Sequence, residues 1–258
     1  MRIKLACITG SKILYVSIPI GLFIVFFGTM GGLERKKDNM EKRLSMKEAI
    51  EARKQATREN PDDANAHFHL GYAYFNHGLY KEAIEAYKQA IKVDPDYAKA
   101  HYNLGVAYDS SGMYKEAIEA FNQSIMIDPD YADAYYNLGV VYFYSDMNEE
   151  AIEAYKQAIR INPDYTKAHN DISHVYNETG RHEESIEACK QVIRINPDYA
   201  KAHYNLGVAY NFLNDGNSAL RQYEILKSLD SELANKLFNF INMEFDEHTK
   251  GNTQGFGV

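Results

Sequence analysis

A proline returns every 34 residues along most of this chain. Each of these prolines follows Asn or Asp and precedes Asp, at Pro61, Pro95, Pro129, Pro163 and Pro197. Residues 98–108 (AKAHYNLGVAY) recur letter for letter as residues 200–210. A fixed period of this length indicates one supersecondary unit stacked many times, because a single unit cannot bury its own apolar face. The sequence therefore predicts a repeat array rather than one globular domain of 258 residues.

Each period holds two helical patterns. In the unit that begins at Ala98, the residues that share a face of the first pattern are His101, Leu104, Gly105 and Tyr108, and those of the second are Ala117, Phe121 and Ser124. Residues three or four apart lie on the same side of a helix. Gly105 has no side chain to hold a partner helix away, and Ala117 is small for the same reason. We therefore expect close helix pairs.

The pattern resembles the tetratricopeptide repeat (TPR), a helix-turn-helix unit of 34 residues. Its Leu-Gly-x-x-Tyr core begins at Leu70, Leu104, Leu138 and Leu206. The small residue of the second helix is Ala83, Ala117, Ala151 and Ala219, and the aromatic one is Tyr87, Phe121, Tyr155 and Tyr223. The resemblance implies an all-α fold, a right-handed α-solenoid superhelix with units at 64–97, 98–131, 132–165, 166–199 and 200–233.

Some parts of the array depart from this pattern. The fourth unit has Ile172-Ser173, Ser185 and Cys189 where the others have Leu-Gly, Ala and an aromatic residue, so we expect looser packing there. Residues 34–63 read as a linker helix with a partial repeat. Residues 232–243 are amphipathic and predict a capping helix, which a terminal repeat needs. The polar residues 244–258 predict a disordered tail.

The N-terminus has a different composition from the array. Residues 1–12 form a basic tail, and residues 13–33 contain no charged side chain. A helix over 13–33 is long enough to cross a hydrocarbon core about 30 Å thick. We interpret this segment as a single-pass transmembrane anchor. A cleaved signal peptide is the competing interpretation, with Thr29 and Gly31 as a weak cleavage site.

The charge distribution does not decide on which side of the membrane the repeat array lies. Residues 34–48 hold six Lys or Arg against three in residues 1–12, which favours a cytoplasmic array. A short basic tail before an apolar segment is also typical of anchors that export the rest of the chain. The array itself is acidic, since the whole chain carries −8 although residues 1–43 are basic. An acidic body lacks a phosphate-neutralising stripe, so we expect no nucleic-acid partner.

The resemblance implies that first helices line a concave face that binds extended peptides or proteins. The amides at Asn103, Asn137 and Asn205 can pair with a peptide backbone, because each offers a donor and an acceptor. Aromatic and basic candidates on the same face are Phe68, Tyr72, Tyr102, Tyr136, Tyr204, Lys99 and Lys201. The alternatives are that the amides are generic repeat consensus on a solvated surface, and that the aromatic rings are half-buried against the next repeat.

Chemistry beyond binding has little support in the sequence. His67, His101, His169 and His203 recur at one position of the first helix, where helix spacing keeps them too far apart to share one metal ion. We see no phosphate loop, nucleophile elbow or zinc-protease motif. We therefore expect no cofactor, no metal and no catalytic activity.

Two functions of different classes remain open. One is a membrane-anchored adaptor that binds a partner protein or extended peptide in its concave groove. The other is a structural scaffold that assembles with itself into homo-oligomers through its ends or its convex face. The capping helix favours the adaptor, because it blocks end-to-end stacking.

Overall fold

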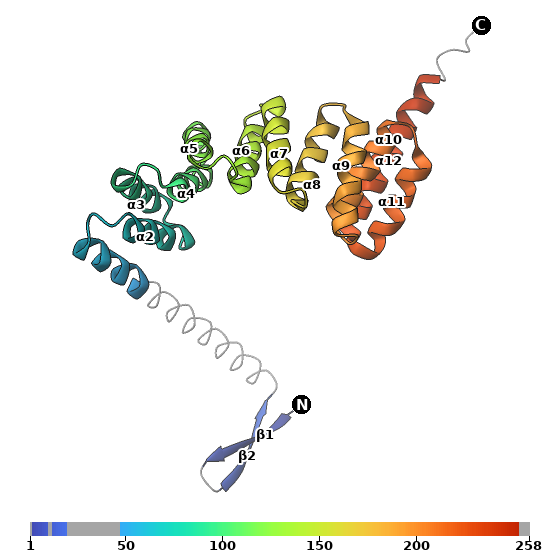
Figure 1. Ribbon diagram of the computed structural model, residues 1–258. Helices are drawn as coiled ribbons and strands as arrows, with labels where there is room; N and C mark the ends of the chain where they lie inside the picture. Colours follow the sequence, from blue (N-terminus) through green and yellow to red (C-terminus); the bar gives the residue numbers. More distant parts are fainter. Residues whose placement is uncertain (1, 10–11, 20–46, 253–258) are drawn as a thin grey trace. The chain divides into compact units, whose positions relative to one another are not determined.

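The computed structural model describes residues 2–9, 12–19 and 47–252 (Figure 1). The chain divides into two units, Met1–Pro61 and Asp62–Val258. In the first unit, strands β1 (Arg2–Thr9) and β2 (Lys12–Pro19) pair antiparallel, with Leu5 opposite Val16. Residues 47–59 of that unit form a helix, where the sequence predicted one.

The predicted anchor, residues 13–33, lies mostly outside the described residues. Its first part belongs to β2, so a strand occupies the place where the sequence predicted the start of a helix. The β-branched and aromatic residues of this stretch also favour extended structure, which is the physical reason for the difference. Within the described ranges, no helix is both long and apolar enough to cross a membrane.

The second unit consists of paired helices. The first helices of the pairs are α2 (Ala64–Asn76), α4 (Ala98–Asp109), α6 (Ala132–Tyr144), α8 (Thr166–Glu178) and α10 (Ala200–Phe212). Their partners are α3 (Tyr80–Val93), α5 (Tyr114–Ile127), α7 (Asn148–Ile161), α9 (His182–Ile195) and α11 (Gly216–Leu229). In Figure 1 the pairs follow one another in chain order, and α12 (Ser231–Asn252) comes last.

Consecutive pairs pack in a regular way. Each second helix contacts the next first helix, and each first helix also contacts the first helix of the next pair, as α4 does with α6. The first helices therefore form one continuous face of this unit, which we call the inner face and which corresponds to the concave face of the family resemblance. The all-helical solenoid predicted for the array is confirmed for the described part of this unit.

The turns inside the pairs require a left-handed backbone. Gly78, Gly112 and Gly180 supply it, with φ between 72° and 73°. Asp146 and Asn214 take the same position in the third and fifth pairs, each with φ of 59°. Asp and Asn tolerate this conformation better than other side-chain-bearing residues. The third pair therefore keeps its turn without a glycine.

Glycine and an aromatic ring lock each typical pair together. A Cβ placed on Gly71 would come within 2.7 Å of the Tyr87 ring, and Gly139 faces Tyr155 at the same distance. The small residues Ala83, Ala117, Ala151 and Ala219 are fully buried. The expected close approach of the two helices is thus present.

The fifth pair differs from the sequence-based expectation. The predicted aromatic residue of its second helix, Tyr223, does not cover Gly207; Leu237 of α12 does. Tyr223 instead lies beside Phe238, with ring centroids 5.1 Å apart. Helix α12 therefore supplies part of the core of this pair as well as covering its end, because Ala234, Leu237 and Ile241 are buried there.

Helix α12 also extends past the predicted cap. It begins where the Asp230 carboxylate accepts hydrogen bonds from the backbone N–H groups of Glu232 and Leu233, both at 3.0 Å. It continues to Asn252, although residues from Glu244 on were predicted to be disordered. Residues 244–250 contain neither proline nor glycine, so nothing in them stops the helix.

The divergent fourth pair is closed in its core. Ser173, Ser185 and Cys189 are fully buried. The Ser185 hydroxyl donates to the Ser173 backbone carbonyl oxygen at 2.9 Å, and the Ser173 hydroxyl donates to the Asn170 carbonyl oxygen at 2.6 Å. Both buried hydroxyl groups therefore have a hydrogen-bond partner. The looser packing that we expected at these three residues is therefore absent.

Candidate peptide-binding face

Aromatic rings form repeated stacks along the inner face. The predicted residues Phe68, Tyr102 and Tyr136 are each half-buried, and each lies between two other rings. One neighbour comes from the second helix of the same pair, at 5.8–5.9 Å from Tyr87, Phe121 and Tyr155. The other is a tyrosine directly before the next first helix, at 5.2, 4.9 and 5.0 Å from Tyr97, Tyr131 and Tyr165. These spacings are typical of favourable ring pairs.

The sequence reasoning missed this second set of tyrosines. Tyr97, Tyr131, Tyr165 and Tyr199 recur with the 34-residue period, immediately after the last four of the five Pro-Asp turns. That recurrence was the available signal. The rings of Tyr97, Tyr131 and Tyr165 pack against Phe68, Tyr102 and Tyr136, so these stacks partly bury three residues that the sequence assigned to peptide contact.

Hydrogen bonds link one first helix to the next across the same face. Tyr136 of α6 donates to Asp171 of α8 at 2.8 Å. Asn137 of α6 donates to the Tyr102 hydroxyl of α4 at 2.9 Å. Tyr165, just before α8, donates to Asp133 of α6 at 2.5 Å. Polar atoms on the inner face are therefore held in fixed positions before any ligand arrives.

The phenols in these links stay protonated. Burial raises the pKa of Tyr136 well above its ordinary value, and the nearby Asp171 carboxylate raises it further. Burial and the hydrogen bond to Asp133 act on the pKa of Tyr165 in the same direction. Both tyrosines therefore act as hydrogen-bond donors at neutral pH.

The three asparagines have different environments. Asn103 is half-buried and donates one amide N–H to the Lys99 carbonyl oxygen at 2.8 Å. Asn137 is also half-buried and uses both amide N–H groups, the second on the Asp133 carbonyl oxygen at 2.9 Å. Asn205 differs, because it is only 6% exposed and donates to the Ser173 hydroxyl at 3.1 Å. Its amide closes the interface between α8 and α10 and is not presented to a ligand.

The remaining candidates also divide by exposure. Tyr72 is 50% exposed, and Lys99 and Lys201 are exposed. Tyr204 packs against the cluster formed by α11 and α12. Tyr144, which the sequence reasoning did not select, is 64% exposed. Fewer of the predicted contact residues are exposed on the inner face than the sequence suggested. Tyr144 is an exposed residue that the sequence analysis did not include.

A small pocket lies beside Tyr144. It has a volume of about 170 Å³, and its lining includes Val140, Phe143, Asp171 and His174 as well as Tyr144. The pocket combines apolar walls with a carboxylate that already accepts a hydrogen bond from Tyr136. Such a mixture suits one side chain of a bound peptide.

Three of the recurring histidines have backbone partners. Nε2 of His101, His169 and His203 lies 2.9, 2.9 and 2.8 Å from the carbonyl oxygens of Pro95, Pro163 and Pro197. A carbonyl oxygen only accepts, so Nε2 carries the proton in each ring. Searched over the described residues, the chain has no group of three or more His, Cys, Asp or Glu placed to hold a metal ion.

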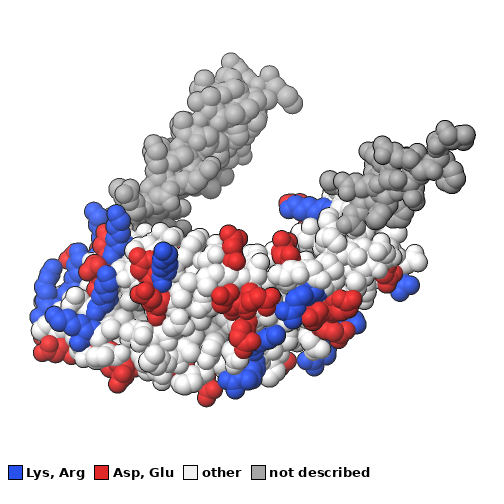
Figure 2. All heavy atoms as spheres, turned by 90° about the horizontal axis from the view of Figure 1, so that it is seen from above, with Lys and Arg blue, Asp and Glu red and all other residues white. Residues whose placement is uncertain are grey.

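Charged side chains are unevenly spread over the surface. On the face drawn in Figure 2, acidic and basic side chains lie next to one another in several groups, with uncharged areas between these groups.

Comparison with known proteins places these features in context. Residues 30–236 match the family model described as the C-terminal domain of cilia and flagella-associated protein 70. No curated protein sequence matches the chain. Among solved structures, MamA is similar at 30% sequence identity over 64% of this chain and 97% of that chain, with a TM-score of 0.61.

Two further structures share the fold. YrrB, described as a TPR protein with an unusual peptide-binding site, is 25% identical over 74% of this chain and 99% of that chain, with a TM-score of 0.65. The protein pilF of Pseudomonas aeruginosa is 18% identical over 77% of this chain and 90% of that chain, with a TM-score of 0.65, and shows the fold alone.

Proposed function

Because the chain belongs to the TPR family described as the C-terminal domain of cilia and flagella-associated protein 70, we propose that it is a protein-interaction module that binds an extended peptide along its inner face. Proteins of this repeat type are typically interaction modules without catalytic activity. YrrB, which is similar to this chain, is described as having a peptide-binding site. These relationships support the class of function, and the residues of this chain support the location.

The observation that carries the proposal is the fixed polar and aromatic lining of α4, α6 and α8. The hydrogen bonds from Asn137 to Tyr102 and from Tyr136 to Asp171 hold acceptor atoms in place along three consecutive first helices. A surface that is ordered before binding loses less conformational entropy when a ligand arrives. The asparagine oxygens and Asp171 accept from peptide N–H groups, while Tyr144 offers exposed aromatic area.

The residues that we propose for peptide contact differ in part from those that the sequence predicted. Asn103 and Asn137 remain in it, together with Tyr72, Lys99 and Lys201, which are exposed. Asn205 and Tyr204 are left out, because the first is buried and the second packs on α12. Phe68, Tyr102 and Tyr136 act mainly through the hydrogen bonds and ring stacks that shape the face.

The test is selection of binding peptides from a displayed random library, with the full chain in a mild detergent as the target. The affinity of a selected peptide is then measured for the Tyr144→Ala and Asn137→Ala variants. We expect each to weaken binding by about tenfold, or 1.4 kcal/mol. The matched control is Asn122→Ala on α5, an exposed asparagine outside the inner face.

Equal affinity of every variant would place the contact elsewhere and contradict the proposal. Circular dichroism and urea unfolding of each variant separate a lost contact from a lost fold. Failure of the library to yield any binder at micromolar concentration would likewise count against a general peptide groove.

We also propose that residues 13–33 anchor the chain in a membrane. The absence of charge over these residues supports this. Expression of the full chain followed by alkaline extraction of membranes tests it, and the mass of the purified chain distinguishes an anchor from a cleaved signal peptide. Release of the chain by alkali, or loss of its first 30 or so residues, would contradict an anchor. Protease protection of the array in intact cells decides between a cytoplasmic and an exported body.

The self-assembling scaffold is the second candidate, and one observation favours it. Near the C-terminal end of the array, Phe212, Leu220 and Phe238 are each 41–42% exposed. Apolar side chains of this size at a surface can support contact with another copy. Sedimentation of the full chain over a range of concentrations tests this, with Leu220→Glu as the variant. A mass that rises with concentration and falls to the monomer in the variant would favour the scaffold.

A further inference from the structure

Residues that depart from the repeat meet at the pocket beside Tyr144. Of the five first helices, only α8 has a carboxylate as its sixth residue, Asp171, and only α8 has an imidazole as its ninth, His174. Only in α6 are both the twelfth and the thirteenth residues aromatic, Phe143 and Tyr144. All four of these residues line the pocket. Departures in two consecutive units therefore come together at one place on the inner face.

Three helices form this pocket. Its lining consists of Val140, Phe143 and Tyr144 from α6, Tyr155 from α7, and Asp171, His174 and Val175 from α8. Tyr155 and Val175 are almost fully buried, whereas Tyr144 and His174 are exposed. The first two residues therefore form the floor, and the last two lie at the rim.

Four rings belong to the lining. The ring centroid of Phe143 lies 5.7 Å from that of Tyr144 and 5.4 Å from that of His174. Tyr155 supplies the fourth ring. The face of an aromatic ring is electron-rich and attracts a cation whose centre lies within about 6 Å of the ring centroid. The walls therefore favour a positively charged group.

Asp171 gives the pocket a carboxylate whose partners are uncharged. Its Oδ2 accepts from the Tyr136 hydroxyl at 2.8 Å, and its Oδ1 accepts from the Asn170 amide at 2.9 Å. Among the described residues, no lysine or arginine lines this pocket or forms an ion pair with Asp171. Each carboxylate oxygen has two lone pairs, so each keeps one acceptor site for a ligand.

The charge of Asp171 also acts on the floor of the pocket. Burial raises the pKa of Tyr155, and the Asp171 carboxylate raises it further. The Tyr155 phenol is therefore neutral. Among the lining residues only a protonated His174 would oppose a cation, and an ordinary imidazole is uncharged at about pH 8. At that pH the pocket combines electron-rich rings with one negative charge.

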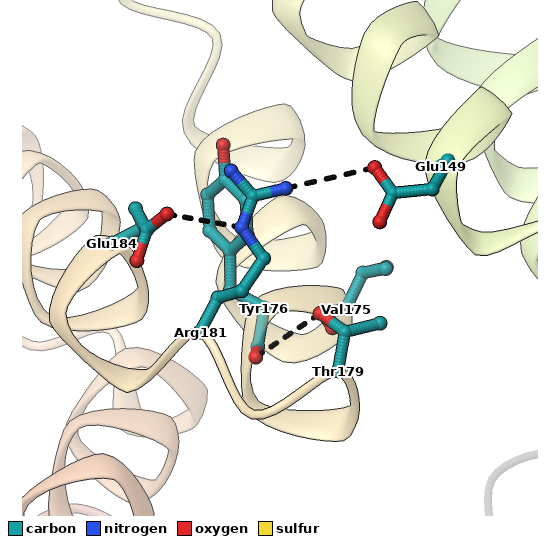
Figure 3. A network of polar contacts seen from close by, with 6 residues as sticks. All are labelled: Glu149, Val175, Tyr176, Thr179, Arg181 and Glu184. Carbon is teal, nitrogen blue, oxygen red and sulfur yellow. Dashed lines mark hydrogen bonds and ion pairs between the residues drawn. The ribbon is translucent and has the colours of Figure 1, made fainter.

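A network of polar contacts joins the helices that form the pocket (Figure 3). Arg181, in the turn after α8, pairs with Glu149 of α7 at 3.6 Å and with Glu184 of α9 at 3.0 Å. Its guanidinium lies 4.6 Å from the ring centroid of Tyr176, the neighbour of Val175 in the pocket floor. These contacts add to the packing of α8 on α7, so the walls are positioned before a ligand binds.

We propose that this pocket binds a lysine side chain of the extended peptide on the inner face, an inference that rests on the peptide-binding function proposed above. The ammonium group donates to Asp171 and lies against the rings, while the alkyl stem contacts Phe143 and Tyr144. The pocket volume of about 170 Å³ suits one such side chain, since a cavity of about 150 Å³ accommodates benzene. Charge complementarity favours lysine over an acidic or a purely apolar side chain.

The test uses the full chain in a mild detergent, with ¹³C-labelled valine methyl groups. Val140 and Val175 report on the pocket, and Val106 reports on the inner face outside it. The probe is the blocked pentapeptide acetyl-Ser-Ala-Lys-Ala-Ser-amide at about pH 8. Its counterpart carries Nε-acetyl-lysine, which keeps the stem but has no charge. We expect the lysine peptide to shift the two pocket valines, and the acetylated peptide to bind at least about tenfold more weakly.

Asp171→Asn is the main variant, because it restores the asparagine of the neighbouring repeats and should leave the fold intact. It should weaken binding of the lysine peptide about tenfold and remove the preference over the acetylated one. Tyr144→Ser, which restores the residue found at Ser110, should weaken binding severalfold. The matched control is Asp146→Asn, an exposed carboxylate outside the pocket lining at a left-handed turn that asparagine also adopts at Asn214. It should change the affinity by less than about twofold.

Equal binding of the two pentapeptides would overturn the proposal, as would unchanged binding in Asp171→Asn and Tyr144→Ser. Shifts at Val106 without shifts at Val140 and Val175 would also overturn it. The peptides selected from the displayed library separate this proposal from the function on which it rests. If a selected peptide loses affinity for Asn137→Ala but not for Asp171→Asn, the peptide groove stands and the lysine pocket does not. If neither the library nor the lysine peptide yields binding, both proposals fail.

Discussion

The ring of Phe121 on α5 lies so close to Gly105 on α4 that a Cβ on this glycine would meet ring atom Cε1 at 2.7 Å. Phe121 is fully buried and cannot move into solvent. Gly105→Ala should therefore lower the free energy of unfolding by about 1–3 kcal/mol, the usual cost of overpacking a core. Urea denaturation followed by circular dichroism measures the change.

Gly216→Ala is the matched control for that substitution. A Cβ there meets nothing within 4 Å, and the residue opens helix α11. Alanine should leave stability unchanged or raise it slightly, because it reduces the freedom of the unfolded chain. Equal destabilisation by both variants would mean that contact with Phe121 is not the cause.

Leu237 should contribute strongly to the stability of the fifth pair, although it lies outside the repeats. It is fully buried and covers Gly207, where the first three pairs use an aromatic residue of the second helix. Leu237→Ala should cost about 2–5 kcal/mol by leaving a cavity. Asn239→Ala, an exposed neighbour on α12, should have little effect. Loss of ellipticity beyond α12 itself would show that the last pair depends on this helix.

The buried tyrosines predict an alkaline limit to stability. Burial raises the pKa of Tyr136 and of Tyr155 far above the ordinary value of about 10. The stabilisation that the folded protein gains from keeping these phenols protonated is fully present below about pH 10. It is lost as the pH rises from about 10 through the raised pKa values of the folded state. Above about pH 10 the unfolded chain releases phenol protons that the folded chain keeps, so the free energy of unfolding falls.

Urea midpoints at pH about 8 and about 10.5 measure this loss. Tyr136→Phe should reduce the drop between the two pH values, since it removes one of the groups concerned. A drop of the same size in the variant would assign the effect to other groups, such as the lysines.

Cys189 should be unreactive in the folded protein. The side chain is fully buried, and burial raises its thiol pKa to about 11, although hydrogen bonds with Ser173 and Ser185 act in the opposite direction. In a Cys7→Ala variant, a disulfide reagent should label the native chain orders of magnitude more slowly than the urea-unfolded chain. Labelling at similar rates would show that the fourth pair opens readily.

The sequence was enough to predict the helix pairs of the array, because the 34-residue period and the pattern of apolar residues can be read from residues close in the chain. Three recurring features carried this prediction: the prolines, the Leu-Gly-x-x-Tyr cores and the small alanines. They indicate where helices begin, which faces meet and how closely the helices approach. The observed helices α2 to α11 begin and end accordingly. The third pair departs from the pattern because it lacks the turn glycine, and Asp146 takes the left-handed backbone in its place.

The candidate site was harder to predict, because exposure depends on what packs against each face. The position that is half-buried at Asn103 and Asn137 is buried at Asn205, where Ser173 and α8 approach closely. Tyr97, Tyr131 and Tyr165 stand outside the helices, so helical periodicity gave no hint that their rings lie on the candidate aromatics.

The amino-acid sequence by itself determined the family, the helix pairs and their order, because these follow from periodic contacts between residues close in the chain. Only the tertiary structure decided which copy of a repeated residue is free to bind. The same residue type in different repeats has different neighbours. Gly207 is covered by Leu237 of α12, and Nδ1 of His203 lies beside Gln222 of α11. Burial and hydrogen bonding are properties of those neighbours, and residues distant along the chain supply them.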